Sequence, residues 1–388
     1  MDVYGKVNPV LRAIMQNVYQ ERKALPSDIL TSVRTETVND KSFCEVWFIT
    51  KGCSHDAKGG CTMCNYGKGC QIEEKRVLDE LKLRLAELPS ELEELIVTPT
   101  GSMLDDEEVP VSMRKSIFAL LKDTESENFY IETRVDSITD EKLKHLKESV
   151  NARNIHIEVG VECTNDWVLR NLVNKNLTFQ EIKKCVSIIH NIDMFVCGNV
   201  GIGIPFLNER TNIALAVNSV RELLDIGFDS VVIFPYHVKP GTLSYWLWKR
   251  GLYECCSLWG IPDVLNHFNR DELKKIHISW YRNYYSDKKK IVSSPSVDAN
   301  DMERLLSLLD GYKNHPGTEA LDALMKFESI DRVKWREKLM RENKSLDLEK
   351  IKNLYYLLSK EFGIPSEQMN VEWESMKLSW EEQKYVFD

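Results

Sequence analysis

Six apolar, β-rich segments alternate with amphipathic segments along the chain, and this alternation restricts the fold more than any other feature. The β-rich segments are residues 43–50, 94–102, 128–134, 155–162, 194–203 and 229–238. Strands that alternate with helices predict an α/β fold with a parallel sheet and right-handed crossovers. An open doubly wound sheet and a barrel or partial barrel both fit six such units. In either fold, ligands bind at the carboxyl ends of the strands.

Helical patterns fill the gaps between these strands, and several begin at a Thr or Asn that would serve as an N-cap. One helical pattern ends at Gly227, as a C-cap would. Beyond about residue 260 the segments are charged and helical throughout. We therefore expect an N-terminal helical extension at 1–42, a core at 43–260 and a helical C-terminal region at 261–388.

The composition indicates a soluble, cytoplasmic protein. The chain has 388 residues, of which 43% are hydrophobic, and none of its apolar runs is long enough to span a membrane. Its N-terminus lacks the apolar core of a signal peptide. The net charge of −9 argues against a broad phosphate-binding surface. Ten cysteines in such a chain are expected as core thiols, metal ligands or catalytic thiols.

The stretch FITKGCSHDAKGGCTMCNYGKGC follows the first predicted strand and spaces Cys53, Cys61 and Cys64 as C-x7-C-x2-C. A zinc site would take His55 or Cys70 as a fourth ligand. A redox pair would use the C-x-x-C alone. A three-cysteine iron–sulfur cluster would leave one iron open to an external ligand. Zinc is the commoner partner of such pairs, but the place after the first strand favours a cofactor with an open iron.

These motifs resemble those of the radical S-adenosylmethionine (SAM) superfamily. The spacing is similar to the Elongator-like and methylthiotransferase-like branch, and still more similar to the family of the radical-SAM subunit of archaeosine synthase. The matching segments are GC…GGCTMC-Y at Gly52–Tyr66, GSMLDDEEVP after the second strand, E-R and G-E at the ends of the third and fourth, and TL--WLWKRG-Y---LW at Thr242–Trp259. The resemblance spans residues 40 to 265.

The resemblance implies a partial (β/α)6 TIM-like barrel with a helical C-terminal extension. It implies that Cys53, Cys61 and Cys64 each ligate one iron of a [4Fe–4S] cluster and that SAM chelates the fourth iron. Reduction would then cleave SAM to a 5′-deoxyadenosyl radical, which takes a hydrogen atom from the substrate.

The turn after the second strand and the end of the third carry the first SAM-binding predictions. Gly101 lets the backbone approach a ligand and Ser102 offers a hydroxyl, where the superfamily holds the SAM amino group; an ordinary turn capped by Asp105 is the alternative. Glu132 would accept hydrogen bonds from the ribose. Arg134 would pair with the methionine carboxylate. A structural ion pair is the alternative for these two residues.

The fourth strand ends at Glu162, which is predicted to contact the ribose or the substrate, with Glu158 on the same side of the strand. Lys175 and Arg170 follow, and either would reach the SAM carboxylate. A solvated surface cation is the alternative for both.

The remaining predictions lie near the adenine and at the mouth of the barrel. Gly201 would bring the backbone against a flat ring, and Tyr66, like Met63, would pack against the adenine or simply within the core. His237 and Lys239 follow the sixth strand and are the catalytic candidates. The other seven cysteines are expected to be mainly buried thiols, without a second C-x-x-C.

The substrate is predicted to be an amino-acid-like small molecule or biosynthetic intermediate. The alternative is a tRNA base that carries an amino acid, modified with the help of a partner subunit. A flavodoxin or ferredoxin would supply electrons. A zinc-binding interaction module without enzymatic activity is the competing hypothesis of another class.

Overall fold

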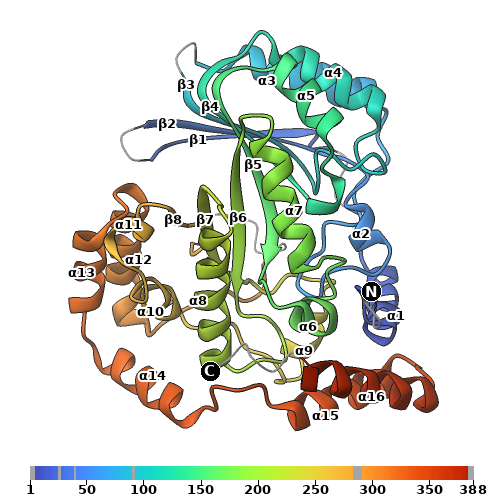
Figure 1. Cartoon of the computed structure of the whole chain (residues 1–388), viewed down its shortest axis with the longest axis vertical. Coiled ribbons are helices and arrows are strands. Elements are labelled where there is room, and N and C mark those ends of the chain that lie inside the picture. Colours follow the sequence, from blue (N-terminus) through green and yellow to red (C-terminus); the bar gives the residue numbers. More distant parts are fainter. Residues whose placement is uncertain (1–4, 25–27, 39–40, 90–91, 283–290, 383–388) are drawn as a thin grey trace.

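The computed structural model describes residues 5–24, 28–38, 41–89, 92–282 and 291–382. Its centre is one eight-stranded sheet whose strands follow each other in chain order. The strands are β1 Thr31–Val38, β2 Lys41–Phe48, β3 Leu92–Pro99, β4 Glu125–Thr133, β5 Asn151–Glu162, β6 Phe195–Ile202, β7 Ser230–Pro235 and β8 Ile276–Ile278. β1 is antiparallel to β2, and every later neighbour is parallel. The sheet curls into a partial barrel (Figure 1).

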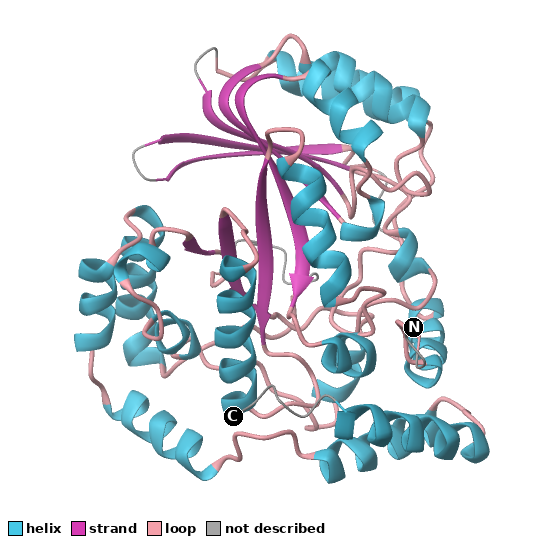
Figure 2. Ribbon diagram, in the orientation of Figure 1, coloured by secondary structure: helices cyan, strands magenta, loops and turns pink. Residues whose placement is uncertain are grey.

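The helices between the strands cover the convex face of the sheet (Figure 2). They are α3 Glu74–Ala86, α4 Val111–Leu121, α5 Asp140–Ser149, α7 Phe179–His190 and α8 Glu209–Asp225. Thr139, Thr178 and Asn208 cap three of them, each accepting a hydrogen bond from a backbone N–H three residues later. The six predicted strands are β2 to β7, so the α/β prediction and the partial barrel are confirmed.

Each strand presents one face to the helices and the other to the interior of the barrel. On β4, Phe129 and Ile131 are fully buried in the core beneath the helices. Tyr130 and Glu132 alternate with them and therefore face the concave side, which we call the lumen. The carboxyl ends of the strands, where the lumen opens, carry the predicted site.

Two strands were not predicted. β1 lies where an entirely helical extension was expected; that expectation holds for α1, Pro9–Gln20, but is wrong for residues 31–38. The sequence TSVRTETV is rich in β-branched residues, and it pairs with β2 over eight positions. β8 lies in a segment expected to be helical, where only α11, Arg270–Leu273, forms a helix. Residues 283–290 of that segment lie outside the described residues. The predicted domain boundaries, at residues 42/43 and 260/261, stay a prediction.

Beyond β8 the described C-terminal residues are mainly helical, as predicted. They form α12 Ala299–Asn314, α13 Thr318–Lys326, α14 Ile330–Arg341, α15 Leu348–Glu361 and α16 Ser366–Glu382. Shorter helices are α2 Ser54–Ala57, α6 Asp166–Val168, α9 Leu243–Trp248 and α10 Gly260–Leu265, with a π-helical turn at Leu169–Val173 and a 3-10 turn at Val135–Ser137. α15 and α16 pack against α1, and α16 also packs against α6 (Figure 1). Across the described residues, none of the helices has the length and apolar character needed to cross a membrane.

Candidate functional site

The cysteine loop leaves the carboxyl end of β2 and folds back on itself. Gly52 adopts a φ of +101°, and a Cβ there would lie 2.5 Å from the carbonyl oxygen of Tyr66. The same carbonyl accepts a hydrogen bond from the N–H of Cys53 at 2.9 Å. Only glycine allows this close return of the chain. The N–H of Cys64 donates to the Cys61 carbonyl at 3.2 Å, so the loop gathers all three predicted ligands.

The three thiols lie close together in a dry environment. Cys53 and Cys61 are each 9% exposed, and Cys64 is half-buried. Burial raises the pKa of the Cys53 thiol and raises that of Cys61 to about 12. Burial, the Asp56 carboxylate and the other two thiols raise the pKa of Cys64 well above its ordinary value. Thiols that resist ionisation to this degree become ligands when a metal centre displaces their protons.

The donor set fits an iron–sulfur cluster. In the part of the chain that the structure describes, no three His, Cys, Asp or Glu side chains form a group that could hold a single metal ion. A cubane cluster makes a different demand, because each cysteine ligates a different iron and the sulfurs need not converge on one point. Three neighbouring cysteine sulfurs meet that demand.

Each thiol has a cation nearby that favours its ionised form. Nη1 of Arg134 lies 3.7 Å from the sulfur of Cys53. Lys175 lowers the pKa of Cys61, and Lys239 that of Cys64, against the larger effect of burial. These cations come from the ends of β4 and β7 and from the loop before α7. The structure thus brings three predicted site residues around the cysteine loop.

The predicted SAM-binding turn after β3 lies directly against Cys53. A Cβ on Gly101 would lie 2.8 Å from the Cβ of Cys53. The backbone N–H groups of Gly101 and Ser102 donate to the Glu108 carboxylate, both at 2.8 Å. The hydroxyl of Ser102 is completely buried and bonds Thr133 at 2.9 Å. Ser102 therefore shapes the turn through contacts with protein.

Glu108 is a residue of this site that the sequence analysis missed, although it stands in the motif GSMLDDEEVP. Burial raises the pKa of its carboxyl to about 7. Its Oε1 accepts a hydrogen bond from the Thr50 hydroxyl at 2.6 Å. Glu108 thereby ties the turn after β3 to the end of β2.

Glu162 and Lys175, both predicted, form an ion pair at 2.8 Å. Glu162 stands at an irregularity of β5 with a φ of +70°, an uncommon conformation for a residue with a side chain. The hydroxyl of Tyr236 donates to the other oxygen of the same carboxylate. Burial alone would lower the pKa of Lys175, but Glu162 and Cys61 raise it above its ordinary value. The lysine is therefore charged.

Gly201 does face a flat ring, but the ring belongs to the protein. A Cβ at Gly201 would lie 2.2 Å from the Tyr236 ring and hydroxyl. Because glycine has no side chain, the phenol of Tyr236 can lie against Gly201 and reach Glu162. Tyr236 thus fills the space that was predicted to accept adenine, and no pattern in the sequence indicated it.

The catalytic candidates after β7 lie in different surroundings. Nζ of Lys239 donates to the hydroxyl of Tyr66 at 2.9 Å and lies 4.5 Å from the centroid of its ring. His237 is buried, with Nε2 2.5 Å from the Trp280 carbonyl and Nδ1 3.0 Å from the Ser294 hydroxyl. Lys239 therefore belongs to the cysteine site, whereas both ring nitrogens of His237 bond the segments around Trp280 and Ser294.

The lumen carries carboxylates that the sequence analysis did not bring together. Glu132 and Glu158 are direct neighbours in the parallel register of β4 and β5 and share one face. Glu132 accepts a hydrogen bond from the Thr98 hydroxyl at 2.6 Å, and Glu158 accepts one from Asn199 at 2.8 Å. Burial, followed by the Glu158 carboxylate, raises the pKa of Glu132 to about 8. Glu45 of β2 contributes further negative potential to both.

The side chains that would have completed a zinc site have other places. Nε2 of His55 lies 3.0 Å from the Asn174 carbonyl, and burial lowers the pKa of its imidazole to about 4. The backbone N–H of Cys70 donates to the Thr50 carbonyl at 3.2 Å. Arg170, the alternative to Lys175, pairs with Glu372 at 2.7 Å.

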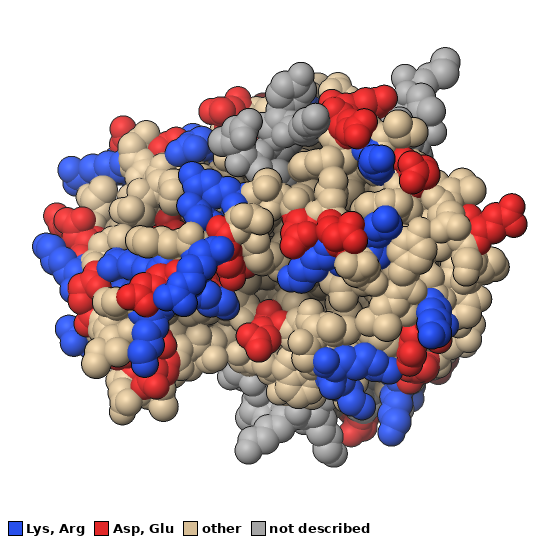
Figure 3. Space-filling view, turned by 90° about the horizontal axis from the view of Figure 1, so that it is seen from below, with Lys and Arg blue, Asp and Glu red and all other residues tan. Residues whose placement is uncertain are grey.

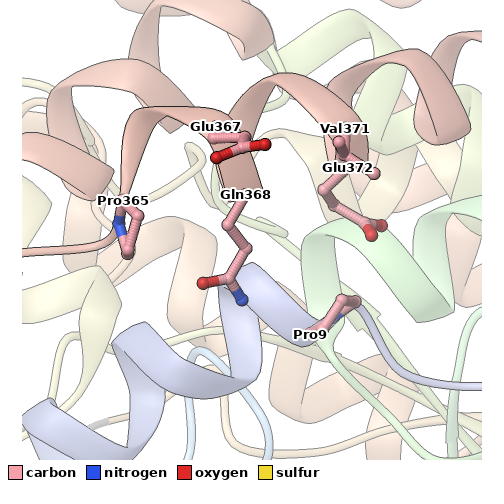
Figure 4. A pocket seen from close by; sticks show the side chains of 6 residues that line it. All are labelled: Pro9, Pro365, Glu367, Gln368, Val371 and Glu372. Carbon is pink, nitrogen blue, oxygen red and sulfur yellow. The ribbon is translucent and has the colours of Figure 1, made fainter.

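Two surface hollows lie away from the cysteine loop. One of about 340 Å³ lies between α1 and α16, where Gln368 reaches towards α1 beside Pro9 (Figure 4). Another of about 620 Å³ lies at the amino ends of β4 and β5, lined by residues such as Glu125 and Asn151. The chemistry of the cysteine loop thus stands apart from both.

Comparisons with known proteins show what this chain is similar to. Residues 47–216 match the family model described as the radical SAM superfamily. An uncharacterized protein of Methanocaldococcus jannaschii is 23% identical over 236 residues, which cover 58% of this chain and 64% of that protein. Archaeosine synthase subunit beta of Methanosarcina acetivorans is 28% identical over 245 residues, which cover 62% of this chain and 68% of that protein. The solved Elp3 structure of Methanocaldococcus infernus aligns with a TM-score of 0.45 and 16% identity, over 63% of this chain and 60% of that one.

Proposed function

We propose that Cys53, Cys61 and Cys64 hold the [4Fe–4S] cluster of this chain, which is an enzyme of the radical SAM superfamily by the match of residues 47–216. We also propose that its substrate is an amino-acid-like small molecule. SAM, its second cofactor, would be cleaved by one electron from the cluster to methionine and a 5′-deoxyadenosyl radical, which would take a hydrogen atom from the substrate. The observation that carries the ligand assignment is the gathering of two buried thiols and one half-buried thiol at the carboxyl end of β2, each beside a cation.

The residues around the loop supply binding and orientation. The charged Lys175, fixed by Glu162, suits the carboxylate of SAM, and Arg134 suits it equally as a planar guanidinium. The Gly101–Ser102 turn brings backbone close to Cys53, where a small polar group would fit. The burial of the thiols keeps water from a reactive centre.

The lumen supports the choice of an amino-acid-like substrate. Glu132 and Glu158 stand side by side on neighbouring strands, and two ionised carboxylates in this position would repel each other. A protonated amine between them would offset the repulsion in a medium of low dielectric constant. The amino group of an amino acid or an amine-bearing side chain is such a cation. We propose that the substrate places this group in the lumen.

A second function rests on the relatives. Archaeosine synthase subunit beta is named as one subunit of an enzyme, so this chain would act with a partner subunit. The substrate would then be the tRNA base carrying an amino acid that the sequence resemblance implies. The face shown in Figure 3 supplies little of the RNA binding in this proposal, since Lys and Arg are interspersed there with Asp and Glu. A flavodoxin or ferredoxin would serve as electron donor in both cases.

Isotope transfer tests the proposal and separates its two branches. The enzyme is purified without oxygen, assayed for iron and sulfide, and incubated with SAM, dithionite and deuterated substrates. Deuterium in 5′-deoxyadenosine from a free amino-acid-like compound supports the first function, and deuterium only from modified tRNA with a partner subunit supports the second. A colourless protein with stoichiometric zinc and no 5′-deoxyadenosine would refute both.

A further inference from the structure

The three cations around the thiols differ in what offsets their charge. Arg134 pairs with Asp105 at 3.2 Å and with Asp136 at 2.9 Å. Lys175 pairs with Glu162 at 2.8 Å. A negative group accompanies each of these two cations, so each set of paired residues adds little net positive charge to the site.

Lys239 is different. Among the described residues, no carboxylate lies within ion-pairing distance of its ammonium group; its partner is the hydroxyl of Tyr66 at 2.9 Å. Burial alone would lower the pKa of Lys239, but Tyr66, Cys64 and Glu162, which lies beyond ion-pairing distance, raise it, so the amine remains charged. The backbone N–H of Tyr66 in turn lies 3.5 Å from the sulfur of Cys64. Lys239 thus brings an unpaired positive charge to the cysteine loop.

The segment that carries Lys239 is fastened to the cysteine loop. The Pro240 carbonyl accepts a hydrogen bond from Asn65 at 3.2 Å. Arg22 donates to the Gly241 carbonyl and, at 2.9 Å, to the carbonyl of Cys64. These contacts hold the loop after β7 against residues 64–66. The backbone of Lys239 is therefore fixed by several hydrogen bonds, and the position of its charge does not depend on one flexible side chain alone.

We infer that Lys239 raises the reduction potential of the cluster on Cys53, Cys61 and Cys64 by stabilising the negative charge that reduction adds. The inference rests on the proposed function, because it needs the cluster to be held there. Net charge, hydrogen bonds to sulfur and exposure to solvent set the potentials of such centres. In a buried site the field of one unpaired charge is weakly screened.

The test compares variants that change the net charge of the site with variants that preserve it. Lys239→Met and Lys239→Gln remove one positive charge, whereas Lys239→Arg keeps it. The double variant Lys175→Met with Glu162→Gln removes an ion pair and leaves the net charge unchanged. After anaerobic reconstitution, iron and sulfide are counted, and the midpoint potential is measured without SAM by redox titration followed by electron paramagnetic resonance.

We expect a more negative midpoint potential in Lys239→Met and Lys239→Gln at unchanged iron content, with a clearly smaller shift in Lys239→Arg and in the double variant. Unchanged potentials in both neutral variants, with full iron, would overturn the inference alone and leave the proposed function standing. If Lys239→Met loses iron, the midpoint potential of Lys239→Gln decides between these outcomes, because glutamine retains a hydrogen-bond donor for Tyr66. Absence of iron and sulfide from the wild type would overturn the proposed function and the inference with it.

Discussion

The guanidinium of Arg22 donates a hydrogen bond to the carboxylate of Asp56, and this ion pair joins the segment after α1 to the cysteine loop. The two side chains are only 3% and 2% exposed. Burial raises the pKa of Asp56, and Arg22 opposes that effect. Asp56 also accepts a hydrogen bond from the N–H of Gly67 at 2.6 Å. One buried pair therefore connects α1 with both sides of the loop.

Replacement of Arg22 by Met leaves Asp56 buried without its counter-ion. Loss of one partner of a buried pair costs about 3–5 kcal/mol, so we expect a loss of that order in the free energy of unfolding. Urea denaturation measures it. Arg12→Met is the matched control, because Arg12 only donates to the exposed Lys58 carbonyl. Equal stability of the two variants would contradict a central role for the pair.

Replacement of Cys53, Cys61 or Cys64 by Ala is expected to abolish both the iron content and the formation of 5′-deoxyadenosine. Cys70→Ala and Cys185→Ala are the controls, since Cys70 is only half-buried beside the loop and Cys185 lies on α7. Both should retain the iron of the wild type. Full iron in any of the first three variants would remove that cysteine from the ligand set.

Glu132 predicts a dependence of stability on pH. Its pKa rises from about 4.5 in the unfolded chain to about 8 in the folded protein, mainly through burial. Between these values the folded state binds more protons than the unfolded state, so its stability falls as the pH rises. Glu132→Gln removes this loss, and we expect its advantage over the wild type to grow by more than about 1 kcal/mol from pH 5 to pH 8.

Urea unfolding at several pH values checks this expectation. Glu127→Gln serves as the control because Glu127 is exposed on the same strand. A pH profile of Glu132→Gln that runs parallel to the wild type would show that Glu132 ionises normally. Glu158→Gln should have a related effect, and the double variant should gain less than the sum, since the two carboxyls titrate as a pair.

Gly201→Ala should disturb the contact between Tyr236 and Glu162, because the new Cβ would lie 2.2 Å from the tyrosine ring. Displacement of the ring costs packing and a hydrogen bond to a charged group, about 1.5–3 kcal/mol for the latter. Gly311→Ala is the matched control, as its Cβ meets nothing within 4 Å in α12. Helix propensity should stabilise this control by about 0.5–1 kcal/mol. Thermal unfolding compares the two.

His237→Gln separates a structural role from a catalytic one. The imidazole bonds Trp280 and Ser294, so its replacement is expected to cost about 1–3 kcal/mol of stability through unpaired buried groups. The yield of 5′-deoxyadenosine per folded protein should remain close to that of the wild type. Loss of that yield in a stable variant would restore His237 as a catalytic candidate.

The sequence predicted the parallel part of the sheet because its six strands are long, apolar and regularly spaced. β1 was not predicted because its polar and β-branched residues form no apolar stripe. β8 was not predicted because Ile276–Ile278 is too short to show a period. The site could be predicted where residues lie within one motif, as Cys53 does. The site could not be predicted where residues from distant elements meet. The pairing of Glu132 with Glu158 depends on strand register, and the place of Tyr236 on Gly201 depends on packing.

The helices α1 and α16 pack against each other, although residues 9–20 and 366–382 are made at very different times during synthesis. The chain emerges from its N-terminus during synthesis. The strands and the cysteine loop are therefore made before α16 exists to pack against α1. During that interval α1 and α6 lack the helix that packs against them in the finished protein. We expect the last helix to cover them only after the chain has left the ribosome, which makes this packing a late step in the maturation of the protein.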